Sequence, residues 1–295
     1  MASKHSENEV RSRNWDGFIP TVLSLSVSSL SSSSTPAPIH LLLHRQTFLH
    51  VGLSSAVDRL AESAVVANAK YGFWFEDEKK RLPLRWHLFT GVLYDLCKGA
   101  QSINKEECSD SGEYLTPWRI KLHFTSYPVD EILSCPDGQA NAKLMFKNSL
   151  KQSLYVQYNH SKITMQLSKE AHDTLWGSVS RHNVSMFMQF CKDYMASEDQ
   201  LVSIPVRMYI DHRPVIQRPC IIRKESSSPK DQTSDLVVLQ SLLEEWLPYT
   251  VKHKEDFSAL VKVAGIEVPL NVPILDLWRN LCHPDLFLYI TVNTI

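Results

Sequence analysis

The sequence lacks the motifs that mark many catalytic and phosphate-binding folds. Only nine of its 295 residues are glycine, and it contains neither a G-x-x-x-x-G-K-[ST] loop nor a G-x-G-x-x-G turn. Both loops use glycine to bring the backbone close to a phosphate group. H-E-x-x-H and G-x-S-x-G are missing as well, so nothing indicates a zinc protease or an α/β-hydrolase. We therefore expect neither an enzyme of these classes nor a cofactor.

The sequence also lacks cysteine pairs, long apolar runs and an excess of one charge. Its six cysteines form no C-x-x-C pair, which argues against a zinc site or a disulfide framework and favours a reducing compartment. No run approaches the roughly 18 apolar residues that span a bilayer, and the charged start does not resemble a secretory signal. Thirty-one basic and 32 acidic side chains give a net charge of −1, so no global field favours nucleic acid. We expect a cytoplasmic protein whose partners are recognised locally.

Strand and helix patterns are present, and they occur in two similar successions. The first predicts strands at 15–29, 39–48 and 118–128, a helix from Ser54 or Ser55 through Asn68, a hairpin at 72–86 and a helix at 87–97. The second predicts strands at 204–210, 215–223 and 286–292, a hairpin at 257–272 and a helix whose first turn contains Pro273. It also predicts a helix from Ser234 or Asp235. The apolar residues on one side of that helix are Leu236, Leu239, Leu242, Leu243 and Trp246. Two strands, a helix and then further strands are typical of a ubiquitin-like β-grasp domain.

Between the two successions the apolar pattern has a helical period. It predicts helices at 146–158, 169–179 and 184–195. The chain is therefore expected to be a mixed α and β protein, with two small strand-rich domains around a helical centre.

Three groups of residues could carry chemistry, and each has a simpler interpretation. His40 and His44 could bind a metal ion, but they lie in a predicted strand and are better read as ordinary edge histidines. The acidic residues 76–78 stand beside basic ones, which favours a solvated hairpin tip over paired catalytic carboxylates. Cys135 precedes a predicted helix whose N-terminus could lower the thiol pKa. We favour a small buried side chain at this position.

The predicted helix 146–158 carries Lys147 and Lys151, which lie one turn apart. Its apolar stripe consists of Phe146, Leu150 and Leu154. At 100° per residue, Lys151 falls at the rim of this stripe, where a lysine can lay its stem on apolar neighbours and keep its ammonium in water. The other interpretation is an amine nucleophile, because a cation four residues back and partial desolvation lower a lysine pKa. The pattern alone favours the first interpretation, and it permits the second without requiring it.

Several stretches, in order along the chain, resemble the autophagy protein 5 family. In the N-terminal half they are WDGFIP at 15–20, the hairpin with F-W-F-E at 73–76 and P-L-R-W at 83–86 together with the helix after it, and TPWRIKLHFTSYP at 116–128. Further along they are FKNSLKQSLYV at 146–156, HDTLWGSV at 172–179, IPVRMYI at 204–210, W-R-N-L at 278–281 and F-L-Y-I at 287–290. The resemblance spans nearly the whole chain.

The resemblance implies an α+β fold with two ubiquitin-like β-grasp domains flanking a helix-rich domain. The implied parts are a polar N-terminal segment at 1–14, a first ubiquitin-like domain at 15–128, a helix-rich domain at 137–197 and a second ubiquitin-like domain at 202–295. Stretches near 28–38 and 98–116 depart from the family pattern as insertions, and the hairpin tip is longer and more charged than usual there. These departures put partner contacts of those loops in doubt.

The resemblance also implies a function. Members of the family accept the ubiquitin-like autophagy protein 12 on one lysine through an isopeptide bond, and that lysine falls on Lys151, whereas Lys147 does not align. The conjugate binds a helix of the coiled-coil autophagy protein 16 in a groove. With the conjugating enzyme of the lipidation pathway it acts like a ligase, promoting transfer of an autophagy protein 8 family member to phosphatidylethanolamine. This implies a cytoplasmic protein, not itself an enzyme, that is peripheral on the phagophore membrane.

Two other functions remain as alternatives. One is an unconjugated adaptor that binds helical partners through ubiquitin-like domains, and the other is a thioester enzyme that uses Cys135. Because the net charge is near zero, any contact with anionic lipid would be local, for example at Lys143, Lys147 or Lys162. The sequence does not identify the residues of the groove for the coiled-coil partner.

Overall fold

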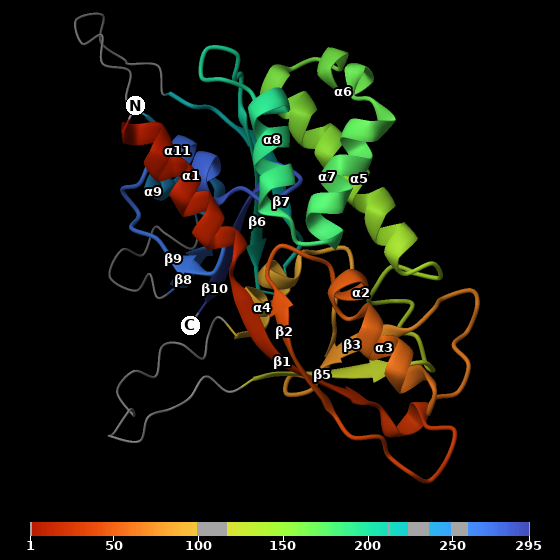
Figure 1. The fold of residues 1–295 in the computed structure, drawn as a ribbon. Helices are drawn as coiled ribbons and strands as arrows, with labels where there is room; N and C mark the ends of the chain where they lie inside the picture. Colours follow the sequence, from red (N-terminus) through yellow and green to blue (C-terminus); the bar gives the residue numbers. More distant parts are fainter. Residues whose placement is uncertain (1, 99–116, 212, 224–235, 249–258, 295) are drawn as a thin grey trace, which may run out of the picture. The chain divides into compact units, whose positions relative to one another are not determined.

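The protein is described by a computed structural model that covers residues 2–98, 117–211, 213–223, 236–248 and 259–294 (Figure 1). The chain forms two compact units. The N-terminal unit comprises Asp16–Phe146 and Val179–His182, and the C-terminal unit comprises Met1–Trp15, Lys147–Ser178 and Asn183–Ile295. Each unit contains a five-stranded mixed sheet. The predicted α+β class is therefore confirmed.

The sheet of the N-terminal unit has the strand order β2-β1-β5-β3-β4. Its strands are β1 (Phe18–Leu25), β2 (Ile39–His44), β3 (Trp74–Asp77), β4 (Leu82–Pro83) and β5 (Trp118–His123). β1 and β5 are parallel, while the other pairs are antiparallel. Helices α2 (Leu49–Gly52), α3 (Ser54–Ala61) and α4 (Thr90–Lys98) complete the unit, with α3 against β1 and α4 against β2.

The sheet of the C-terminal unit repeats this arrangement. Its order, β7-β6-β10-β8-β9, results from adding five to each strand number of the first sheet. The strands are β6 (Ile204–Ile210), β7 (Ile216–Cys220), β8 (Ala259–Val263), β9 (Ile266–Glu267) and β10 (Leu288–Thr294). β6 and β10 form the parallel pair. Helices α9 (Leu239–Trp246) and α11 (Ile274–Leu281) belong to this unit, and α11 packs against β6 and β10. The expected pair of β-grasp domains is confirmed.

The helical centre contains the three predicted helices and one more. They are α5 (Gln139–Tyr158), α6 (Lys162–Gln166), α7 (Lys169–Ser180) and α8 (Val184–Tyr194). An additional helix, α1 (Ala2–Trp15), lies against α11 and α8 (Figure 1). The sequence did not predict α1 as a helix because its composition is polar. Its anchor is Trp15, which is buried and stacks on Phe187 with ring centroids 4.9 Å apart. Over the described part of the chain, no helix is both long and apolar enough to cross a membrane.

Three predicted helices have different limits in the structure. The helix predicted at 146–158 is α5, which already begins at Gln139, and the two others are shorter than predicted. The helix predicted through Asn68 ends at Ala61, because the following residues turn and the backbone N–H of Val65 donates to the Ser29 carbonyl over 2.9 Å. The helix predicted from Ser234 or Asp235 begins at Leu239. Its two predicted starts lie outside the described residues, and Leu236 instead forms a β-bridge with Arg223. In both shortened helices, pairing between extended segments replaces an end turn of the helix. The insertion expected at 98–116 lies almost wholly outside the described residues.

The acidic residues 76–78 are not all part of a solvated tip, which corrects the prediction for this hairpin. Asp77 ends β3 and is only 1% exposed. Its Oδ2 accepts the indole N–H of Trp118 over 2.7 Å, and its Oδ1 accepts the backbone N–H groups of Lys79 and Lys80 over 3.0 and 2.8 Å. The carboxylate is buried because a tight turn that follows a strand leaves N–H groups that need an acceptor. Glu76 pairs with His123 over 2.7 Å, so it is not a free tip residue either.

Candidate functional site

Lys151 lies on α5 with its side chain exposed to solvent. The predicted apolar stripe of this helix is confirmed, because Phe146 is 1% exposed and Leu150 and Leu154 are fully buried. Tyr155, one turn further along, is 52% exposed. The helix therefore buries one side completely and presents Lys151 on another. A primary amine in this position can be reached by a large macromolecular partner.

A buried polar network holds the α5 segment around Lys151 against the second sheet. Arg207 on β6 donates through Nη1 to Ser149 Oγ over 2.7 Å and through Nη2 to Gln152 Oε1 over 3.0 Å. Ser149 Oγ also donates to the carboxylate of Asp285. Ser153 Oγ donates to the backbone carbonyl of Asp285 over 2.5 Å. The residues before and after Lys151 are thus fixed to β6 and to the loop before β10.

The positive charge of Arg207 and the negative charge of Asp285 compensate each other within this network. Asp285 is 1% exposed, and its carboxylate accepts the Tyr289 hydroxyl over 2.8 Å and lies 3.5 Å from Arg207 Nη1. Burial raises the pKa of Asp285, and the charge of Arg207 opposes that rise. The Arg207 guanidinium also lies over the Phe287 ring, 3.8 Å from its centroid, in a cation–π contact. The network fixes the rotation of α5 and so keeps Lys151 turned outward.

Arg207 and Asp285 are not among the residues predicted from the sequence to form the site. The signal that could have found Arg207 is its place in IPVRMYI, where it is the one charged residue of an otherwise apolar strand. A charge in a buried strand needs a partner. The sequence does not reveal that the partner is Asp285, because a separation of 78 residues in the chain carries no local pattern.

The other candidate residues show no site chemistry. Cys135 is 1% exposed, and burial raises its pKa to about 12, so the expected buried thiol is confirmed and a thiolate nucleophile is disfavoured. His44 stacks on His182 with ring centroids 3.0 Å apart, and burial followed by the charge of His182 lowers the pKa of His44 to about 4. Within the described ranges, no three His, Cys, Asp or Glu side chains gather as metal ligands would.

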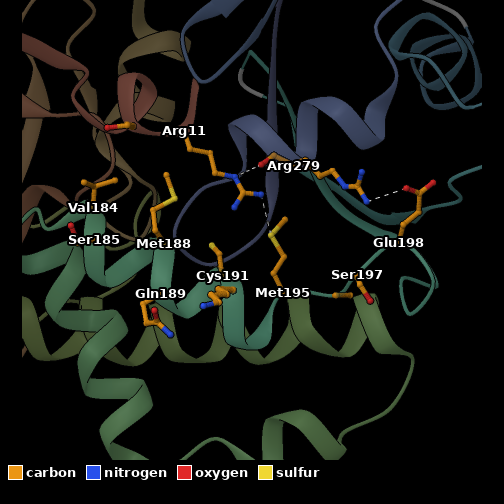
Figure 2. Close-up of a pocket in the computed structure, with 13 residues that line it drawn as sticks. Arg11, Val184, Ser185, Met188, Gln189, Cys191, Met195, Ser197, Glu198 and Arg279 are labelled. Carbon is orange, nitrogen blue, oxygen red and sulfur yellow. Dashed lines mark hydrogen bonds and ion pairs between the residues drawn. The ribbon is translucent and has the colours of Figure 1, made fainter. Parts of the chain in front are cut away.

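A groove of about 1070 Å³ lies between α1, α8 and the residues that follow α8 (Figure 2). We call it the α1–α8 groove. Val184, Met188 and Met195 form apolar parts of its lining, as Figure 2 shows, and we call these three residues its apolar floor. Arg11 reaches across from α1, donating through Nε to the Arg279 carbonyl and through Nη2 to the Met195 sulfur over 3.4 Å.

The charged residues of the lining, which we call the rim of the α1–α8 groove, carry more positive than negative charge. Arg11, Lys192 and Arg279 line it together with Glu198. Arg279 pairs with Glu198 over 3.2 Å (Figure 2). An apolar floor with a cationic rim suits an amphipathic helix that carries acidic side chains, and methionine side chains adapt readily to such a partner.

Comparisons with known proteins agree with the fold and with the resemblance in the sequence. Three family models match: "Autophagy protein ATG5, UblA domain" at residues 14–124, the alpha-helical bundle region of the same protein at 139–196, and its UblB domain at 203–292. Autophagy protein 5 of Debaryomyces hansenii is 27% identical over 306 residues, covering 99% of this chain and 97% of the relative. Autophagy protein 5 of Aspergillus clavatus is 25% identical, with 99% of both chains covered.

A solved structure agrees as well. The crystal structure of Kluyveromyces marxianus Atg5 matches with a TM-score of 0.75 and 25% identity, covering 96% of this chain and 98% of that one. The two ubiquitin-like domains and the helical region thus occur in the same order in this chain and in the family. The chain belongs to the autophagy protein 5 family.

Proposed function

We propose that this protein is a covalent acceptor in autophagosome formation, in which Lys151 receives the C-terminal glycine of the ubiquitin-like autophagy protein 12. The observation that supports this most directly is the exposed amine of Lys151 on a helix whose neighbouring residues are anchored by Arg207 and Asp285. An anchored helix presents the amine in a reproducible position, and positioning is a large part of the rate of group transfer.

The chemistry required of this chain is limited to supplying a nucleophile. A conjugating enzyme carries the glycine as a thioester, and the Lys151 nitrogen attacks its carbonyl carbon. The new C–N bond forms as the C–S bond breaks, the thiolate leaves on the enzyme, and the amine proton passes to solvent. The chain is consumed once in this step, so it is an acceptor and not an enzyme.

The second part of the proposal concerns the α1–α8 groove. We assign it to the helix of the coiled-coil autophagy protein 16, because its volume, apolar floor and cationic rim suit an amphipathic helix. The conjugate and this partner then act like a ligase with the conjugating enzyme of the lipidation pathway. They promote transfer of an autophagy protein 8 family member to phosphatidylethanolamine.

This function places the protein in the cytoplasm and peripherally on the phagophore membrane. Any lipid contact made by the chain itself would be local, at lysines such as Lys143, Lys147 and Lys162. We retain 15–128, 137–197 and 202–295 as proposed domain limits. No nucleic-acid partner is proposed.

The acceptor is tested by immunoblotting the tagged protein from its own cells under reducing, denaturing conditions. Wild type and Lys147→Arg are expected to show a heavier band that resists reductant, and Lys151→Arg is expected to lose most of it, because arginine keeps the charge but offers no amine nucleophile. If the wild type lacks this band, the unconjugated adaptor becomes the better account. If the band is undiminished in Lys151→Arg, Lys151 is not the acceptor.

The groove assignment is tested with Met188→Asp, which puts a charge into the apolar floor. Binding of the partner's N-terminal helix, measured by calorimetry, should weaken at least about tenfold, as is usual when a central apolar contact is lost. Met165→Asp is the matched control, because Met165 is 81% exposed on α6 and does not line the groove. Equal binding by the two variants would mean that the helix docks elsewhere.

A further inference from the structure

The two amines of α5 have different surroundings, although they lie one turn apart. Lys147 Nζ is 3.9 Å from Asp173 Oδ1 on α7, and the side chain of Lys147 is 29% exposed. Lys151 is exposed, and its side chain forms neither a hydrogen bond nor an ion pair within the described residues. One amine is thus held against the neighbouring helix, and the other is presented to solvent.

His172, the neighbour of Asp173, shows that these groups form one cluster. Burial is the main cause that lowers the pKa of His172, and the charges of Lys147 and Lys151 lower it further, while Asp173 opposes them. Both amines of α5 therefore lie within electrostatic reach of this part of α7. The negative charge that lies against Lys147 in this cluster is that of Asp173, whose Oδ1 is 3.9 Å from Lys147 Nζ.

We propose that Asp173 is a specificity-determining residue that withholds Lys147 from conjugation and leaves Lys151 as the acceptor. The inference rests on the proposed function. An amine can attack a thioester only after it has left its ion pair and lost its proton, and Lys147 must first separate from Asp173. Lys151 has no such contact to break.

The size of this effect is limited by solvent. Partly exposed ion pairs shift an equilibrium by roughly 1.5-fold to fivefold, so Asp173 biases the choice between the two amines and does not make it absolute. The outward position of Lys151, set by the Arg207 network, supplies the rest of the selectivity. The effect of Asp173 is therefore best measured where Lys151 cannot compete.

The test uses a conjugation reaction reconstituted from the full-length chain, the modifier and its activating and conjugating enzymes. Mass spectrometry of tryptic peptides quantifies the branched peptide at each lysine. In a Lys151→Arg background, Asp173→Asn is expected to raise conjugation at Lys147 by about 1.5-fold to fivefold. The matched control is Glu170→Gln, which removes the same charge from the first turn of the same helix and should leave conjugation at Lys147 unchanged.

Two failures can be told apart. If wild type is conjugated at Lys151 but Asp173→Asn behaves like Glu170→Gln, Asp173 does not determine specificity, and the proposed function stands. If wild type carries no branched peptide at Lys151, the proposed function fails and the inference fails with it.

Discussion

Replacing Arg207 by methionine is expected to lower the free energy of unfolding by about 3 to 5 kcal/mol, the range seen when one partner of a buried ion pair is removed. Asp285, 1% exposed, would keep a buried carboxylate without its cation. Ser149 and Gln152 would also lose their contacts with the guanidinium. Urea unfolding, followed by tryptophan fluorescence, measures the loss.

Two further variants make this prediction specific. Arg223→Met removes an arginine whose side chain is 50% exposed and pairs with Glu198 over 3.1 Å, so it should cost under about 1 kcal/mol. Adding Asp285→Asn to Arg207→Met should recover part of the loss, because the uncompensated charge is then gone. An Arg207 variant that is no less stable than the Arg223 variant would show that the network does not anchor α5.

The strands and the α5 stripe could be predicted because they depend on local periodicity. Phe146, Leu150 and Leu154 recur at the helical period and are buried as that period requires. The repeated order of elements likewise reflects alternation within each strand and turn residues between strands. What periodicity does not contain is pairing across the chain, which shortened the predicted helices at Val65 and Leu236.

The candidate site could be predicted only in part, for the same physical reason. The sequence places Lys151 on a helix rim, where the pattern favours snorkelling, and only the resemblance pointed to a nucleophilic role. Asp77 was predicted to be solvated because its neighbours are charged, whereas Trp118 and the turn amides bury it. The burial of Asp77 depends in part on Trp118, and the outward position of Lys151 depends on the contact of Arg207 with Ser149. Both contacts join residues that are distant in the sequence.

Acidification is expected to destabilise the N-terminal unit through His50. This side chain is 2% exposed among aromatic rings, with the centroids of Phe73 and Phe75 at 4.8 and 5.2 Å. Burial lowers its pKa from 6.5 to about 4. Between these values the unfolded chain binds a proton that the folded chain does not, so stability falls as pH falls below about 6.5. The loss approaches about 1.4 kcal/mol per pH unit and totals roughly 3 kcal/mol near pH 4.

The pH slope is the useful readout, because a substitution at His50 also changes packing. The free energy of unfolding of wild type, His50→Leu and His40→Leu would be measured by urea unfolding at several values between pH 5 and pH 7.5. His50→Leu should lose about 1.4 kcal/mol per pH unit of the acid-side slope. His40→Leu should keep it, because His40 is exposed on β2. An unchanged slope in His50→Leu would mean that His50 takes up its proton in the folded state as readily as in the unfolded chain. In that case the aromatic cluster around it would be open to water.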